Sequence, residues 1–192
     1  GEKSMEGRFL FDYENGIWKE YHQNGELKAI GNYSDGLENG EWKIYYDNKT
    51  LKSIGYFVGG FEESWWKEYH KNGKKHQEVE YKNGLIWNLK TPYSNKGEKL
   101  SKSVFKNGSG YRKTYYADGS LWSNGKCKEG NLDGEWKYYY PNGNMASFGK
   151  YFEGERTGKW QYYHQNGEIK TLGNYKNDEM VGVWRNYNEK GK

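Results

Sequence analysis

The stretch GEWKIYY, residues 40–46, decides the fold, because its pattern returns along the whole chain. Counting outward from Trp42, another Trp stands 24 residues before it, at Trp18, and another 24 residues after it, at Trp66. A second series with the same spacing comprises Trp136, Trp160 and Trp184. A fixed period of this length indicates an array built from one small structural unit.

Extending the 24-residue count across the stretch between Trp66 and Trp136 gives eight equivalent positions, which we call slots. The 24-residue step from Trp66 reaches Lys90, and the step back from Trp136 reaches Arg112, so one interval contracts to 22 residues. The slots are Trp18, Trp42, Trp66, Lys90, Arg112, Trp136, Trp160 and Trp184. A tyrosine follows every slot by three residues, at Tyr21, Tyr45, Tyr69, Tyr93, Tyr115, Tyr139, Tyr163 and Tyr187. Similar residues also recur at seven, fifteen and eighteen residues after the slots, so the 24-residue register is not an accident.

Each repeat has the pattern of a β-hairpin. A β-prone run such as residues 42–46 is followed by Asn-Gly, as at 24–25, 72–73, 142–143 and 166–167. Asn-Gly accepts the positive φ of a type I′ turn, whose twist matches that of the paired strands. In the second strand, near residues 27–33, Ala29 and Gly31 share a side and leave room for a neighbouring ring.

These patterns predict an all-β fold with almost no helix. We expect an elongated array of about seven to eight stacked hairpins, each of 24 residues, that forms a twisted single sheet and a single domain over residues 1–192. Composition agrees, because aromatic residues are 19% of the chain against 33% for all hydrophobic residues, so rings must build the core. Glycine, at 27 residues, and proline, at 2, fit many tight turns and few linkers.

The motif GxWKxYY, followed by NGxLK and GxY, resembles the MORN-variant repeats of the bacterial YwqK family. It is seen at residues 40–46 and 158–163 and continues in 166–175. The resemblance covers residues 7–191 and implies stacked hairpins in one sheet. Members of that family are named as antitoxins because some are encoded beside polymorphic toxins. MORN-type arrays are also attributed to scaffolding and lipid contact, and the family offers no catalytic residues to carry over.

The centre of the array, residues 62–112, departs from the pattern. Lys90 and Arg112 replace Trp, Ser64 replaces Gly, and Pro92 enters a strand. Drift in a tolerant part of the array is one interpretation, and a distinct recognition patch or bend is the other. Under the first interpretation, Lys90→Trp with Arg112→Trp should stabilise the protein.

No residue pattern predicts catalysis, a metal site or a cofactor. His22, His70 and His164 share one column, four residues after the slot, and are explained by the repeat. The single cysteine, Cys127, occupies an aromatic column and excludes a disulfide framework. A net charge of +4 is too mild to indicate a nucleic-acid partner, and no apolar run is longer than three residues, as at residues 9–11. We therefore expect no enzyme.

One constellation has the character of a binding surface. Lys or Arg lies two residues before most of the tyrosines in the Tyr column, which places rows of charge and ring on one strand face. Either the lysine stems merely cover packed rings, or this face contacts a ligand. The candidate binding residues are Lys43, Tyr45, Lys67, Tyr69, Lys90, Tyr93, Arg112, Lys113 and Tyr115.

The sequence therefore predicts a non-enzymatic protein-binding repeat protein, an antitoxin or immunity protein that masks a partner, expected to be a polymorphic toxin, by occlusion. The alternatives are a cell-wall or carbohydrate-binding module and a membrane-associated scaffold. The location follows from the function: cytoplasmic for an immunity protein, and exported if a signal peptide was removed before Gly1.

Overall fold

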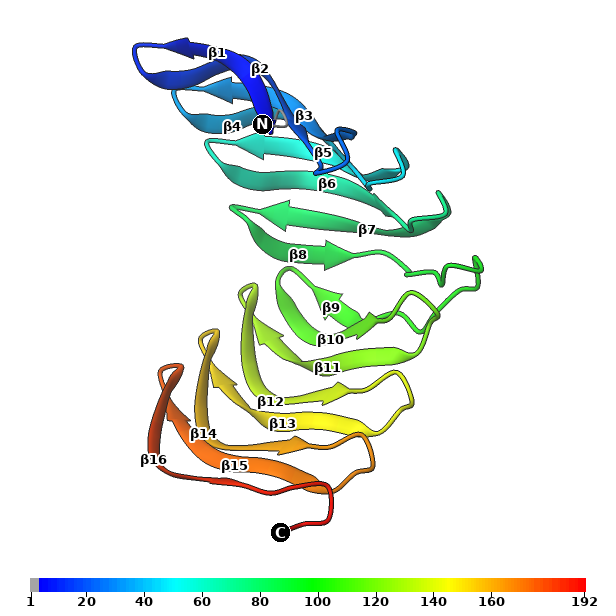
Figure 1. Cartoon of the computed structure of the whole chain (residues 1–192), viewed down its shortest axis with the longest axis vertical. Helices are drawn as coiled ribbons and strands as arrows, with labels where there is room; N and C mark the ends of the chain where they lie inside the picture. The colour runs from blue at the N-terminus through cyan, green and yellow to red at the C-terminus, as the bar shows by residue number, and fades with distance from the viewer. Residues whose placement is uncertain (1–3) are drawn as a thin grey trace. The chain divides into compact units, whose positions relative to one another are not determined.

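The computed structural model describes residues 4–192 as sixteen antiparallel strands, with no helix in that range. Within each of the two sheets, every strand pairs with its neighbours in sequence (Figure 1). The first sheet contains β1 (Met5–Leu10), β2 (Tyr13–Tyr21), β3 (Leu27–Ser34), β4 (Leu37–Tyr45), β5 (Leu51–Val58), β6 (Phe61–Tyr69), β7 (Lys75–Lys82) and β8 (Leu85–Leu89). The second contains β9 (Val104–Lys106), β10 (Ser109–Tyr115), β11 (Leu121–Lys128), β12 (Asn131–Tyr139), β13 (Met145–Phe152), β14 (Glu155–Tyr163), β15 (Ile169–Lys176) and β16 (Glu179–Asn186). The expected all-β hairpin array is confirmed.

The strands group into two eight-stranded sheets, and the chain forms two compact units. The first unit ends at Leu100, and the second begins at Ser101. The division lies inside the stretch 62–112, where the sequence departs from its own pattern. Between β8 and β9 the chain forms no strand but makes an isolated bridge, Tyr93 to Lys99, around a turn closed by the bond from the Ser94 amide to the Glu98 carbonyl oxygen.

The core of each unit is built from tryptophans that lie over bare glycines. A Cβ added to Gly55 on β5 would stand 2.1 Å from Cδ2 of Trp66 on β6, so only glycine fits beneath this ring. The Trp66 Nε1–H donates to the carbonyl oxygen of Tyr56, at 3.3 Å. Trp66 is 4% exposed as a result. The same contact recurs for Trp18 over Gly7, Trp42 over Gly31, Trp136 over Gly125, Trp160 over Gly149 and Trp184 over Gly173.

A second aromatic column connects these tryptophans edge to face. Tyr33 lies 5.2 Å from Trp42, and Phe57 lies 5.1 Å from Trp66, measured between ring centroids. In the second unit Tyr151 lies 5.2 Å from Trp160 in the same way. Edge-to-face pairs are favoured by the ring quadrupole. We call the side of each sheet that carries these rings the Trp face and the opposite side the Lys face.

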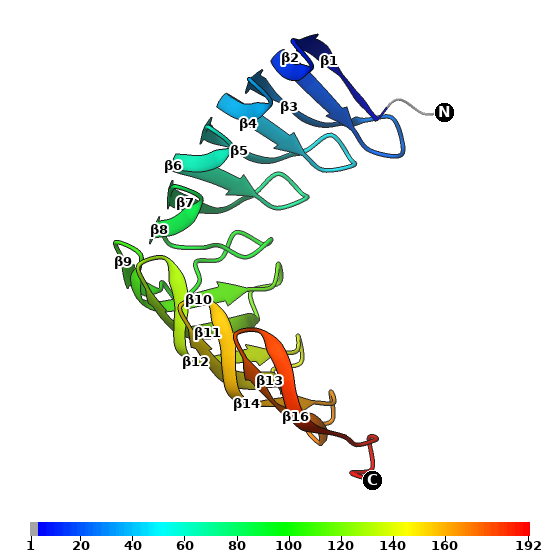
Figure 2. The same ribbon diagram turned by 90° about the vertical axis from the view of Figure 1, so that its left-hand side faces the viewer.

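Side chains also join consecutive repeats at the long turns. The side-chain amide of Asn72 donates to the carbonyl oxygen of Asn95, at 2.7 Å. Asn24 and Asn48 each make the equivalent bond to a carbonyl oxygen of the next repeat. Figure 2 shows these turns of the first unit following one another along one edge. The three column histidines serve the same purpose, because each ring bonds a carbonyl 23 residues ahead, as His70 bonds Tyr93.

In the irregular centre, a different side chain fills the buried position that tryptophan occupies in the regular repeats. Lys90, the expected slot residue, turns to the Lys face, and its amide donates to the carbonyl oxygen of Glu78. Leu89 takes the buried position instead and is 8% exposed. Its partner on β7 is Val79, which stands where other repeats have glycine and is 1% exposed. Lys90→Trp would therefore not restore the missing ring, because a Trp at residue 90 would follow Lys90 to the opposite face.

We predict that Gly55→Ala destabilises the first unit by about 2–3 kcal/mol, because the added Cβ overlaps the Trp66 ring. The matched background is Trp66→Leu, which imitates the natural pair of Val79 and Leu89. In that background Gly55→Ala should cost almost nothing, and urea unfolding of the four proteins measures both steps. Equal costs in the two backgrounds would contradict the ring-over-glycine account.

Lys49 offers a second test, because its φ is +69° at a turn position where neighbouring repeats have glycine. Lys49→Gly should raise the free energy of unfolding by about 0.5 kcal/mol, since relief of the left-handed strain exceeds the added flexibility of the unfolded chain. Lys49→Ala is the control, because it also removes the exposed ion pair with Glu26 but keeps the strain. A gain in stability from the alanine variant would assign the effect to charge.

Candidate functional site

The Lys face of the first unit alternates lysine with aliphatic side chains. Lys43 on β4 and Lys67 on β6 are both paired with Ile54, which lies between them on β5. The lysine stems can thus cover an apolar row while their ammonium groups stay in water. Tyr45 and Tyr69, farther along the same strands, are half-buried. In the second unit the equivalent Lys137 ammonium lies 6.0 Å from the Phe148 ring centroid.

A charged cluster surrounds Glu78 on this face. Its carboxylate forms ion pairs with Lys75 and with Lys90, and these bonds lower the pKa of Glu78 to about 2. The Lys90 ammonium lies 4.6 Å from the centroid of Trp65, and the Lys75 ammonium lies 5.9 Å from that of Tyr93. Two of the predicted binding residues, Lys90 and Tyr93, therefore belong to one cluster on β7 and the segment after β8.

The remaining predicted residues belong to the second unit and do not share one face. The Lys113 ammonium donates to the Ser101 hydroxyl at 3.0 Å, and the Tyr115 hydroxyl donates to the Ser101 carbonyl at 2.7 Å. Arg112 lies on the Trp face, where its guanidinium is 5.1 Å from the Trp136 ring centroid. It replaces a ring in the stack, and its Nε is buried without a hydrogen-bond partner among residues 4–192.

The Trp face of the second unit carries a tyrosine surface that the sequence analysis did not single out. Tyr138 and Tyr162 stand two residues after their tryptophans and donate or accept hydrogen bonds with Tyr151 and Tyr175, at 3.1 and 3.2 Å. The ring of Trp122, which is 46% exposed, lies 6.1 Å from that of Tyr138. The period of two in β-strands, counted from the tryptophans, could have identified this row.

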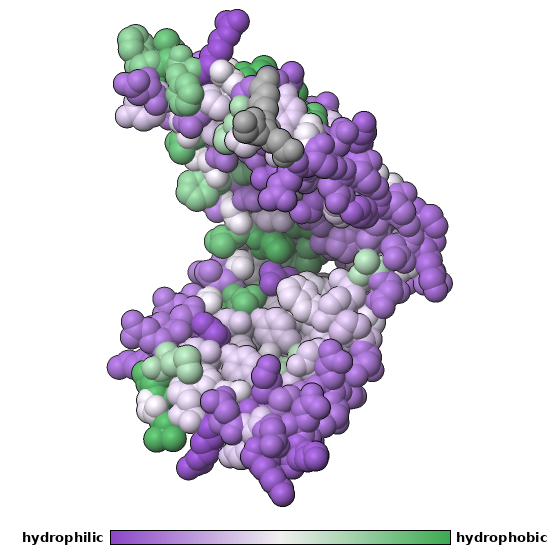
Figure 3. Space-filling model, viewed as in Figure 1, coloured by the Kyte–Doolittle hydropathy of each residue, from purple (hydrophilic) through white to green (hydrophobic). Residues whose placement is uncertain are grey.

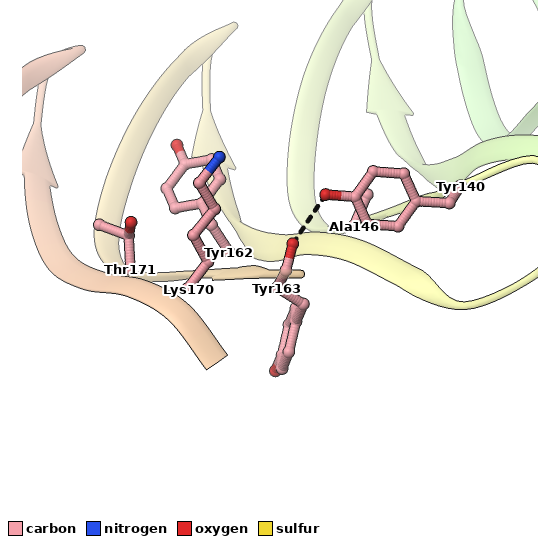
Figure 4. Close-up of a pocket in the computed structure, with 6 residues that line it drawn as sticks. All are labelled: Tyr140, Ala146, Tyr162, Tyr163, Lys170 and Thr171. Atoms are coloured by element: carbon pink, nitrogen blue, oxygen red, sulfur yellow. Dashed lines mark hydrogen bonds between the residues drawn. The ribbon is translucent and has the colours of Figure 1, made fainter. Parts of the chain in front are cut away.

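A pocket of about 280 Å³ opens on this surface. Figure 4 shows its lining: Tyr140, Ala146, Tyr162, Tyr163, Lys170 and Thr171. The Tyr140 hydroxyl donates to the carbonyl oxygen of Tyr163 at 2.7 Å, which fixes one wall. The small side chain of Ala146 leaves the space, because the equivalent positions in the first unit hold Lys28, Lys52 and His76.

Two tyrosines of this surface, Tyr138 and Tyr162, stay protonated at neutral pH. Burial, with a hydrogen bond to Tyr175, raises the pKa of Tyr162 to about 12, and burial also raises the pKa of Tyr138. Both phenols are therefore neutral near pH 7 and can donate hydrogen bonds. Arg156 is paired with Asp178, Nε to Oδ1 at 2.6 Å, and its guanidinium lies 4.0 Å from the Tyr175 ring centroid.

Reactive groups do not converge in the described part of the chain. Residues 4–192 hold no group of three His, Cys, Asp or Glu side chains that could bind a metal ion. Burial raises the pKa of Cys127, so its thiol is a poor nucleophile at neutral pH. No helix long and apolar enough to cross a membrane occurs among these residues.

Comparison with known families agrees with this repeat architecture. The family model described as "MORN repeat variant" matches residues 14–35, 38–58, 66–83, 132–147 and 156–177. The matches leave out the stretch between residues 84 and 131, where Leu89 and Arg112 replace the expected rings. No curated protein matches the chain. Because the five matches cover just over half of its sequence, this protein belongs to the MORN repeat variant family.

Proposed function

We propose that this protein is an antitoxin or immunity protein that neutralises a partner toxin by covering a surface that the toxin needs. Membership of the MORN repeat variant family indicates a repeat-containing binding protein, and repeats of this family are generally not enzymatic. The observation that carries the proposal is the combination of half-buried tyrosines and cationic side chains on regular sheets. Tyrosine, tryptophan and arginine are the residues that most often dominate protein interfaces.

The proposed contact surface is the Lys face of the first unit. Lys43 and Lys67, with their half-buried tyrosines, lie on β4 and β6 on either side of β5, so a partner would meet them together. The strands hold these side chains in fixed rows, which lowers the entropy lost on binding. Repeat proteins commonly bind partners along such an extended face.

A glycan-binding function is the second candidate, and the tyrosine pocket of the second unit favours it. Tyr162 and Tyr140 offer rings, and Thr171 and Lys170 offer hydrogen-bond donors, around a volume of about 280 Å³. Concave sites with aromatic walls and a few polar groups are typical of small-ligand binding. A membrane-associated scaffold has only the scattered lysines in its favour.

We predict that co-expression of this protein rescues growth of cells that express a partner toxin, which is to be sought among the products of neighbouring genes. Lys43→Glu with Lys67→Glu should weaken toxin binding at least tenfold, because reversed charges oppose the partner's surface, and should reduce rescue. Isothermal titration with the purified toxin measures the affinity.

The matched control is Lys128→Glu with Lys176→Glu, which makes the same charge change at exposed positions of the second unit. Equal loss of affinity in both double variants would assign the effect to net charge alone. Rescue failure with every toxin encoded near the gene, together with retention of the wild-type protein on cell-wall glycan beads, would favour the glycan-binding alternative.

A further inference from the structure

The short turns of the first unit carry an exposed apolar column. The residue directly after each turn is Tyr13, Leu37, Phe61 or Leu85, at 24-residue spacing, with 59%, 50%, 57% and 39% of its surface exposed. Leu10 and Val58 are paired with Tyr13 and Phe61 and widen the column. Figure 3 shows green, apolar groups at the edge of the molecule where these turns lie.

A glutamate accompanies three of these apolar residues. A Cβ placed on Gly60 would lie 3.5 Å from Cδ2 of Leu37 and 3.7 Å from Oε2 of Glu38, so the two side chains flank the glycine of the next turn. The pairs Tyr13 with Glu14 at Gly36, and Phe61 with Glu62 at Gly84, have the same arrangement. We name these six residues the turn strip: Tyr13, Glu14, Leu37, Glu38, Phe61 and Glu62.

The turn strip is acidic, with one glutamate in each of its three pairs. None of its glutamates forms an ion pair with a lysine or arginine of the described chain, and Glu38 accepts only the Tyr33 hydroxyl, at 3.4 Å. Asp12 and Asp35 in the turns add further negative charge. The nearby Tyr33 reflects this field, because burial and then Glu38, Glu20 and Glu14 raise its pKa to about 12.

The second unit shows that the fold does not require an apolar residue followed by glutamate after the turn. Its residues directly after the turns are Ser109, Asn131, Glu155 and Glu179, and the positions that follow Asn131, Glu155 and Glu179 hold Leu132, Arg156 and Met180. Both units nevertheless form the same hairpins with the same backbone bond between turns, as from Gly60 to Glu38 and from Gly154 to Leu132. The turns of the second unit also expose Phe152 and Met180, so what the fold does not require is the first unit's apolar residue followed by glutamate.

The spacing of the strip is compatible with a helical partner segment, either an α-helix or a polyproline II helix, whose turn is about 9.3 Å. Successive pairs are two strands apart, which is about 10 Å. Residues seven apart on an α-helix share a face and are about 10.5 Å apart along its axis. Residues on one face of a β-strand recur at roughly 6.6 or 13 Å, so a strand does not match.

We propose that the turn strip binds an amphipathic α-helix of a partner protein, in which an apolar residue and a neighbouring lysine or arginine recur every seven residues. The apolar residues would lie against Tyr13, Leu37 and Phe61, and the cations would meet Glu14, Glu38 and Glu62. This inference rests on the proposed protein-binding function and adds the chemistry of the partner segment. A docked amphipathic helix is a common mode of peptide recognition.

The test uses the full chain and a fluorescein-labelled helical peptide of three heptads, with one Leu-Lys pair per heptad on an alanine and glutamine background. Fluorescence anisotropy should show binding that weakens as salt increases. Leu37→Asn with Phe61→Ser should reduce affinity at least tenfold. Both substitutions copy residues that the second unit carries in the same column, and unchanged thermal unfolding would confirm that the fold is kept.

Charge and register have separate controls. Glu38→Gln with Glu62→Gln should weaken binding and flatten its salt dependence, whereas Glu155→Gln with Glu179→Gln on the second unit should change neither. A peptide with its Leu-Lys pairs six residues apart should bind at least tenfold more weakly than the heptad peptide.

Equal binding of the six-residue and heptad peptides would overturn the proposal, as would absence of binding or stronger binding of a proline-rich peptide with a three-residue period. The antitoxin proposal is tested separately by growth rescue. If rescue is intact while no peptide binds, the turn strip inference fails and the proposed function stands.

Discussion

The contact of a tryptophan ring with a bare glycine on the preceding strand is the constraint on which each sheet depends. A lone β-sheet has no second layer to cover it, so its core must come from side chains that lie flat along the sheet itself. The indole does this only if no Cβ stands beneath it, and its N–H must reach a carbonyl because it leaves water. The carbonyl belongs to the residue ten positions before the tryptophan, and the glycine stands eleven positions before it. These two contacts fix the spacing within the repeat.

The same constraint explains which parts of the fold the sequence could predict. The Trp, Tyr and Gly columns follow from the ring contact and the turns, so period and strand order are visible in the sequence. The orientation of the Lys90 side chain is not visible in the sequence. A shift of one residue moves a side chain to the other face of the sheet, and Leu89 with Val79 supplies an alternative buried pair. Nothing in residue 90 alone signals that its neighbour has taken the core position.

Candidate surfaces were less predictable, since a repeat pattern describes what the repeats share. The Lys and Tyr rows were visible because nearly every repeat has them. Tyr138 and Tyr162 were missed because the equivalent positions in the first unit hold Glu20, Ile44 and Glu68. Differences between equivalent positions of the two units carry the specific information, because the shared backbone shows that folding alone does not choose those residues.

The bonds between successive long turns also bear on how the chain folds. Asparagine, histidine and tyrosine side chains reach carbonyl groups 23 residues ahead, and every strand pairs with a sequence neighbour. All-β proteins usually fold slowly because distant segments must meet, and loop closure then costs entropy. Here each closure spans about one repeat, so structure can start at any hairpin and spread to its neighbours. Folding speed should consequently depend on the best-formed hairpin rather than on the length of the array.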